Sequence, residues 1–129
     1  MQRIRLLPQK MAILRYEPGA AVTIPTTGFF SLIRTEDELS VVVEQLRVPR
    51  GALKKSTGWR LFQVQGPFAL DAIGVLASIT APLAEAGVSI FALATFDTDY
   101  FLISGRQTAR AMHALCAAGH KVICEGEAS

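Results

Sequence analysis

The stretch from residue 66 to residue 103 restricts the fold of this chain more than any other part of the sequence. It opens with a Gly-Pro turn, and its apolar residues then recur at the spacing of a helix until Gly87. Residues 88–96 are almost wholly apolar, and a polar tip at 97–99 separates them from a second apolar run at 100–103. The stretch therefore predicts a helix followed by two strands joined by a tight turn.

The residues that flank this stretch complete an alternating order of strands and helices. Trp59–Gln65 is apolar enough to be the strand before the turn, and Lys121–Cys124 is expected to be the last strand. Ser104–Gln107 fits a capping box that starts a second helix, which is expected to stop at Gly119. Because strand-helix-strand units need right-handed crossovers, this order predicts an α+β, ferredoxin-like βαββαβ fold, with an antiparallel four-stranded sheet and both helices on one face.

Two residues are expected to shape the first helix. Asp71 stands at its start, where the carboxylate can accept hydrogen bonds from free backbone N–H groups as an N-cap. Pro82 lies inside the helical pattern, so it should remove one backbone hydrogen bond near Ser78 and bend the helix.

The first part of the chain contains strand patterns and no clear helix. Ile4–Leu7 and Met11–Tyr16 are two short strand candidates, and Pro8 is expected to break the strand between them. Residues 20–28 contain proline, threonine and glycine, so they are expected to form a loop with at most one helical turn.

A hairpin and a surface connection are expected next. Phe29–Ile33 and Leu39–Val43 form a strand pair joined by an acidic tip. Residues 47–58 combine proline, glycine and four cations, which marks a surface connection and the best domain boundary. We therefore predict two modules, residues 1–58 and residues 59–129.

The two modules are similar around their hairpins. Aligning residues 30–33 with residues 91–94 places Glu38 opposite Asp99, which suggests a duplication in which the first module is degenerate. Any two hairpins with acidic tips look somewhat alike, so chance similarity stays open as the alternative.

Composition limits the class of protein. The 129 residues are 50% hydrophobic, which is enough for a real core, and the net charge of +2 is too small to indicate binding to nucleic acid or to an anionic membrane. The basic run at residues 47–55 has no interleaved aromatic residues, so it is interpreted as a solvated loop. No apolar run reaches the roughly 18 residues that span a bilayer, and the N-terminus lacks the apolar region of a signal peptide. A cytoplasmic globular protein is expected.

The sequence resembles a known family. Residues 66–103, GPFALDAIGVLASITAPLAEAGVSIFALATFDTDYFLI, are similar to the second module of small bacterial proteins with tandem ACT domains, and TEDELSVVVEQ resembles their first module. The chain is similar, more weakly, to the tandem-ACT arginine sensors of animals and to the ACT modules of aspartate kinases. The resemblance implies a regulatory fold that binds small molecules, usually amino acids, at interfaces between modules, and it implies no particular ligand.

The resemblance singles out residues on the predicted hairpin. Asp99 matches an acid that contacts the ligand in the arginine sensors, and its carboxylate could pair with an ammonium or guanidinium group. Ser89 and Ile90 match a pair whose backbone groups hold the polar end of the ligand in those sensors. From the residues alone, Asp99 is equally a solvated turn acid, and Ser89 and Ile90 are ordinary strand residues.

The turn before the first helix is the other expected wall of the pocket. Free N–H groups at a helix start attract a carboxylate, and glycines permit close approach. The candidate ligand-binding residues there are Ala69, Leu70, Asp71 and Gly74. Asp71 either caps the helix or points outward to accept the amine of the ligand. The sensors carry an acidic pair in this turn, whereas Ala72 follows Asp71 here, so the resemblance does not imply arginine as the ligand.

No enzymatic, metal or cofactor site is expected. His113 and His120 are separated by six residues, so they do not share a helix face as metal ligands at i and i+4 would. Cys116 lacks an identifiable basic partner, and both it and Cys124 are interpreted as buried, inert thiols. The sequence also contains no nucleophile elbow and no phosphate-binding loop.

Two functions from different classes remain. The first is a regulatory module that binds an amino-acid-like ligand between modules or protomers and passes the signal to an enzyme or regulator. The second is an assembly module without a small ligand. Exposed sheet edges and a high apolar content favour a homodimer in both cases, so ligand-dependent thermal stabilisation is what distinguishes them.

Overall fold

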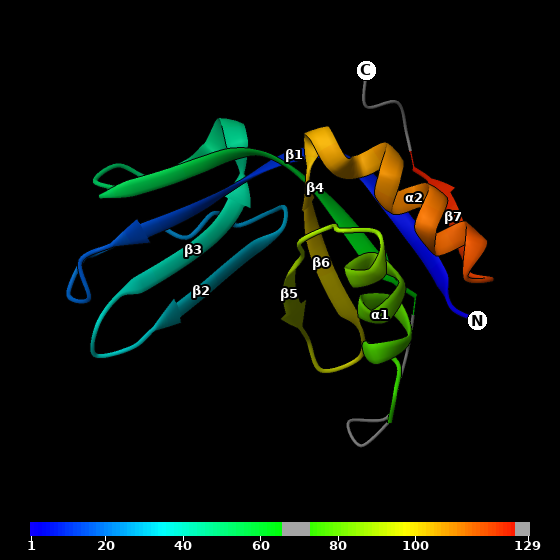
Figure 1. Cartoon of the computed structure of the whole chain (residues 1–129). Coiled ribbons are helices and arrows are strands. Elements are labelled where there is room, and N and C mark those ends of the chain that lie inside the picture. Colours follow the sequence, from blue (N-terminus) through cyan, green and yellow to red (C-terminus); the bar gives the residue numbers. More distant parts are fainter. Residues whose placement is uncertain (66–72, 126–129) are drawn as a thin grey trace. The chain divides into compact units, whose positions relative to one another are not determined.

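The computed structural model describes residues 1–65 and 73–125, and Figure 1 shows its elements coloured along the sequence. The chain divides into two compact units, one made of Gln9–Trp59 and the other of Met1–Pro8 together with Arg60–Ser129. The predicted boundary between residues 58 and 59 differs from this division, because it places Met1–Pro8 in the first module. The described elements are β1 (Arg3–Tyr16), β2 (Phe30–Arg34), β3 (Leu39–Glu44), η1 (Gln45–Arg47), β4 (Lys54–Val64), α1 (Ala77–Glu85), β5 (Phe91–Ala94), β6 (Asp99–Ser104), η2 (Gly105–Gln107), α2 (Thr108–Ala117) and β7 (Lys121–Cys124).

The unit that contains the C-terminal half has a sheet in the order β7-β1-β4-β6-β5. β5 and β6 form the predicted antiparallel hairpin. The prediction of a four-stranded antiparallel sheet is wrong in one respect, because β1 lies between β4 and β7 as a fifth strand and pairs with β7 in parallel. The insertion has a physical basis, since Ile4 and Leu6 are buried in the core of this unit and the N–H of Gln65 donates to the carbonyl of Arg3 at 2.9 Å.

Both helices cover one face of this sheet, as predicted, and Figure 1 shows them on the same side of its strands. The rings of Phe62 and Phe101 stack with their centroids 4.9 Å apart. The buried residues of this core are Ile4, Leu6, Phe62, Val64, Ile79, Leu83, Val88, Phe101, Ile103, Ala111 and Leu115. The result is the predicted α+β, ferredoxin-like arrangement.

Both helices end at a glycine, as predicted. Gly87 and Gly119 have φ values of +74° and +93°, in the left-handed region that favours glycine. The residue after each glycine donates back to a carbonyl five residues earlier, at 2.9 Å from Val88 to Leu83 and at 3.0 Å from His120 to Leu115. These bonds satisfy carbonyls that the helix ends would otherwise leave free.

The predicted capping box at the start of α2 is wrong. Residues Gly105–Gln107 form the short 3-10 helix η2, and the side chain of Ser104 makes no capping hydrogen bond. Gln107 donates instead from Nε2 to the carbonyl oxygen of Gly87 at 3.4 Å. The 3-10 turn separates Ser104 from the first turn of α2, so the reciprocal bonds of a capping box do not form.

The unit of Gln9–Trp59 consists of strands and loops with the short helix η1. Its strands follow the order β2-β3-β1-β4, and β2 and β3 form the predicted hairpin. The predicted loop at residues 20–28 is confirmed. Ala20 and Val22, at the start of this loop, pack against the core of the unit. The buried residues of that core are Ala12, Leu14, Tyr16, Leu39, Val41 and Val43.

Pro8 does not break β1, contrary to the prediction. The carbonyl of Arg3 accepts from the N–H of Gln65, the residue directly after β4, and backbone groups alternate sides along a strand, so the nitrogen of Pro8 faces away from β4. On that other side, the pairing with β7 ends at Leu6 and the pairing with β3 begins at Met11. The N–H that proline lacks therefore costs no ladder hydrogen bond.

The predicted surface connection at residues 47–58 is wrong in its second half. Lys54–Gly58 forms the beginning of β4, and its side chains are all exposed. An exposed strand end made of lysine, serine, threonine and glycine has no apolar alternation by which it could be recognised.

The two hairpin turns have the same hydrogen bonds. The N–H of Thr35 donates to the carbonyl of Glu38, and the N–H of Thr95 donates to the carbonyl of Thr98, each at 2.9 Å. Each threonine hydroxyl oxygen also accepts from the N–H of the same partner at 3.2 Å. Thr98 therefore corresponds to Glu38, and the predicted alignment of Glu38 with Asp99 is wrong by one residue. The duplication itself stays a prediction.

Candidate functional site

Asp99 is a half-buried residue at the start of β6. It pairs across the hairpin with Ala94, so it is part of the strand and not of the turn tip. Because side chains alternate along a strand, Asp99 shares a face with Phe101 and Ile103, which pack into the core with the two helices. Among the described residues, no hydrogen-bond or ion-pair partner contacts its carboxylate, which leaves it available to a cationic group.

Ser89 and Ile90 lie at the opposite end of the same hairpin. Ser89 is exposed, and Ile90 is half-buried against the core. β5 begins at the next residue, and its first and last residues pair with Leu102 and Asp99 respectively. These two cross-strand pairs are three residues apart, which is roughly 10 Å along a strand, and Ser89 and Ile90 lie beyond the first of them. The structure therefore does not bring Asp99 together with Ser89 and Ile90 within one chain.

Of the four candidate site residues in the turn before α1, only Gly74 lies within the described residues. Ala69, Leu70 and Asp71 lie outside the described residues. The prediction that Asp71 is the N-cap of the first helix is wrong, because α1 begins at Ala77 and Leu76 is its N-cap. Gly74 is exposed, its φ of +82° favours glycine, and a Cβ placed there would meet no atom within 4 Å. α1 begins at Ala77, and Pro82 lies inside it as predicted, whereas the bend of the helix stays a prediction.

A row of polar side chains crosses the sheet face opposite to the helices, and the sequence reasoning missed it. Arg5 donates from Nε to Glu125 Oε1 and from Nη1 to Gln63 Oε1, each at 2.8 Å. Gln63 in turn donates from Nε2 to the hydroxyl of Tyr100 at 3.0 Å. The available signal was that Arg5 and Gln63 each stand between two apolar strand residues. Since the partners of Arg5 lie on β4 and directly after β7, this row holds neighbouring strands together.

The histidines and cysteines do not gather into a site. His113 is exposed and His120 is buried. Cys116 and Cys124 are both free and exposed, so the prediction of buried thiols is wrong. Cys116 follows the buried Leu115, and one residue turns a helix by about 100°, which directs its side chain away from the core. Over residues 1–65 and 73–125, no group of three or more His, Cys, Asp or Glu could hold a metal ion.

None of the helices in the described parts of the chain has the length and apolar character needed to cross a membrane.

Comparisons with known proteins point to one family. A family model described as an ACT domain matches residues 55–117. The cytosolic arginine sensor for mTORC1 subunit 1 of Bos taurus is 32% identical over 93 residues, which are 67% of this chain and 27% of the sensor. The human protein of that name is also 32% identical, over 82 residues. The chain spans about a quarter of the length of these curated relatives.

Solved structures are similar in fold over nearly the whole chain. Protein Atu0741 from Agobacterium tumefaciens is 33% identical with a TM-score of 0.87, and the match covers 99% of this chain and 96% of that one. The ligand-free regulatory subunit of aspartate kinase from Thermus thermophilus has a TM-score of 0.57 at 12% identity, and the match covers 88% of this chain and 94% of that one. At that identity, the likeness to the aspartate kinase subunit concerns the fold alone.

Proposed function

Because this chain belongs to the ACT-domain family, we propose that it is a regulatory protein that binds a small amino-acid-like molecule and is not an enzyme. The observation that carries the proposal is the half-buried carboxylate of Asp99, which has no partner among the described residues. A carboxylate held on a strand can form a charge-assisted hydrogen bond with an ammonium or guanidinium group. The relatives named as arginine sensors support a regulatory role.

The proposed ligand lies between two copies of the chain. Asp99 is separated from Ser89 and Ile90 by more than roughly 10 Å along the hairpin, which is further than one α-amino group lies from its own carboxylate. In a side-by-side homodimer, Asp99 of one protomer would hold the ammonium or guanidinium group, and the backbone of Ser89 and Ile90 of its partner would hold the carboxylate. The turn residues Ala69, Leu70, Asp71 and Gly74 complete the proposed wall of the pocket.

The division into two modules and the cytoplasmic location are part of the same proposal. Residues 1–58 are a degenerate first ACT-like module and residues 59–129 are the second, in a cytoplasmic protein. The matching turns at Thr35 and Thr95 support a common origin of the two hairpins. The family match at residues 55–117 falls almost wholly in the second module.

A second function, assembly without a small ligand, is favoured by a different observation. Phe96 at the tip of the β5–β6 hairpin is 74% exposed, and Ile33 on β2 is 52% exposed. Exposed apolar side chains of this size are common at surfaces that contact another protein. In this case the homodimer would be the functional unit and no metabolite would stabilise it.

A thermal-shift panel of amino acids and nucleobases tests the choice between the two functions. A ligand at about 100 times its dissociation constant stabilises the folded state by roughly 2.7 kcal/mol, which raises the melting temperature by about 8 °C for a chain of this size. Such a shift supports the sensor. The absence of a shift across the whole panel contradicts it and favours assembly. Sedimentation at micromolar concentration checks the homodimer, since a monomer would remove the proposed interfacial pocket.

A further inference from the structure

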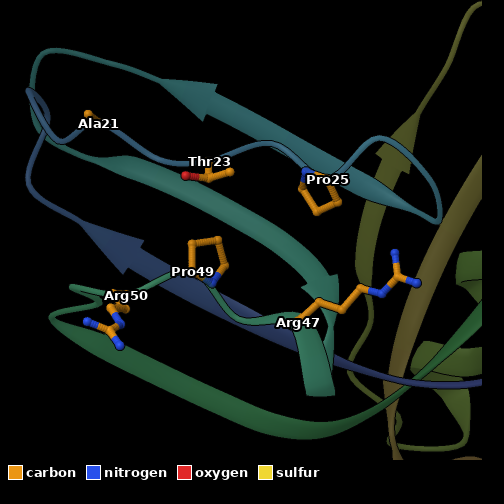
Figure 2. Close-up of a pocket in the computed structure, with 6 residues that line it drawn as sticks. All are labelled: Ala21, Thr23, Pro25, Arg47, Pro49 and Arg50. Carbon is orange, nitrogen blue, oxygen red and sulfur yellow. The ribbon is translucent and has the colours of Figure 1, made fainter.

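The unit of Gln9–Trp59 contains a pocket that the proposed function does not use. Its volume is about 370 Å³, which lies within the range of small-ligand sites and exceeds the size of a bare inorganic ion. Figure 2 shows one wall formed by the loop after β1 and the other by the end of η1 and the connection that follows it. The lining residues are Ala21, Thr23, Pro25, Arg47, Pro49 and Arg50.

The loop presents alternate residues to the core and to the pocket. Ala20 and Val22 pack against the buried residues of the unit. Ala21 and Thr23 are exposed and line the pocket, followed by the half-buried ring of Pro25 (Figure 2). The loop thus lies over the core on one set of side chains and leaves the other set for contact with a ligand.

Both walls are held in place by the rest of the unit. Arg34 donates from Nε to the carbonyl of Pro18 at 2.8 Å and from Nη2 to that of Ala20 at 3.3 Å, which holds the loop. The hydroxyl of Tyr16, a buried residue, donates to the carbonyl of Pro49 at 2.6 Å, which holds the connection. A pocket whose walls are already held loses less conformational entropy when a ligand binds.

The two arginines of the pocket differ in their partners. Arg47 donates from Nη1 to the carbonyl and the hydroxyl of Thr27, each at 3.1 Å, and its Nε lies 3.8 Å from Glu44 Oε2. Arg50 is exposed, and within the described residues it has neither a hydrogen-bond partner nor an ion-pair partner. Two arginines therefore line the pocket, and only one of them lies near a carboxylate, which leaves a local excess of positive charge.

We infer that this pocket binds a small organic anion, whose carboxylate or phosphate group pairs with Arg50 while its apolar part lies against Pro25 and Pro49. Guanidinium groups bind both kinds of oxyanion in a bidentate manner, and the Thr23 hydroxyl adds a hydrogen-bonding group. On this inference, Arg47 and Arg50 belong to a binding site, whereas the sequence indicates that they lie in a solvated loop. The site lies in a different unit from Asp99, so it stands or fails independently of the proposed amino-acid site.

Benzoate and phenyl phosphate are suitable probes, because they share one apolar ring and differ in the anionic group. Titration of each into the full-length, 15N-labelled protein is followed by amide chemical shifts, with benzyl alcohol as the neutral control. We expect saturable shifts at residues 20–25 and 47–50 with at least one anion, and none with benzyl alcohol. The anion that binds more tightly identifies the headgroup class. No saturable shift with either anion, or equal binding of benzyl alcohol, would overturn the inference.

Two variants, together with a matched control, test whether the lining residues of the pocket bind the anion. Arg50→Gln should weaken the anion by about tenfold without changing the melting temperature, because the side chain is exposed and unpaired among the described residues. Arg15→Gln is the control, since Arg15 is also exposed and alternates with the core-facing Leu14 and Tyr16, on the other face of the strand. Ala21→Phe should abolish binding by filling the pocket without a change in charge.

Each variant can contradict the inference. Equal loss of affinity in Arg15→Gln and Arg50→Gln would show non-specific attraction to surface cations. Unchanged affinity in Ala21→Phe would place the anion outside this pocket. Either result would overturn the assignment of the site.

Discussion

Nε2 of His120 lies 2.8 Å from the carbonyl oxygen of Ser78, at the position in α1 where the backbone lacks a donor. Pro82 stands four residues after Ser78 and has no N–H, so it cannot make the helical bond to that carbonyl. The N–H of Gln2 donates to Nδ1 of His120 at 2.9 Å, which leaves Nε2 as the protonated nitrogen that donates to Ser78. A buried histidine therefore fills the gap that the proline leaves in the helix.

His120→Ala should destabilise the protein by about 2 to 3 kcal/mol, because it leaves the carbonyl of Ser78 and the N–H of Gln2 without their partner. Urea denaturation measures the change in the free energy of unfolding. His113→Ala is the matched control on α2, where the exposed side chain should contribute less than about 0.5 kcal/mol.

The coupling between His120 and Pro82 is tested by a double-mutant cycle. Pro82→Ala restores an N–H that can bond to Ser78, so His120→Ala should cost about 1 kcal/mol less in that background. If His120→Ala costs the same with and without Pro82, the histidine does not replace the missing helical bond.

Gly119→Ala should destabilise the protein by about 1 to 2 kcal/mol, because its φ of +93° is unfavourable for a residue with a Cβ. No atom lies within 4 Å of that Cβ, so the effect comes from the backbone alone. Gly19→Ala is the control, since Gly19 has equal space and no positive φ, and it should be neutral or stabilise by up to about 1 kcal/mol. Equal melting temperatures for the two variants would contradict this explanation.

Stability at alkaline pH should depend on Tyr16. Burial raises the pKa of its hydroxyl above the ordinary value of 10.0, so the folded protein keeps this proton at a pH where the unfolded chain has lost it. The contribution of Tyr16 is therefore complete below pH 10 and is lost as the pH rises through the folded-state pKa. Denaturation from pH 8 to pH 11 should show a smaller decline in Tyr16→Phe than in the wild type, and parallel declines would contradict the prediction.

Local sequence patterns were enough to predict those structural features that depend on neighbouring residues alone. Gly87 and Gly119 end the helices where a left-handed residue is needed, and the two hairpins follow from apolar runs around polar tips. These features depend on a few neighbouring residues, so the sequence displays them directly.

The features that depend on distant residues could not be predicted in this way. The place of β1 between β4 and β7 is decided by strand pairing across the chain, and the role of His120 depends on Gln2 and Ser78, far away in sequence. Pro8 shows the same limit, because its effect depends on which side of β1 lacks a partner strand.

The choice of site residues stays a prediction, and their geometry could not be predicted from the sequence. Asp99 was placed next to the hairpin tip, and the structure puts it at the start of β6. Its distance from Ser89 and Ile90 follows from the register of β5 and β6, which the sequence does not specify. This distance is the reason for proposing that two copies build one site.

Calorimetric titration of the ligand identified by the panel into wild type, Asp99→Asn and Asp97→Asn tests the regulatory account most directly. Asp97 is the matched control, because it is an exposed acid two residues away without a partner among the described residues. Loss of a charge-assisted bond of roughly 1.5 to 3 kcal/mol should weaken binding to Asp99→Asn by about 10- to 150-fold. Asp97→Asn should bind as the wild type does. Wild-type affinity in a folded Asp99→Asn protein would contradict the account.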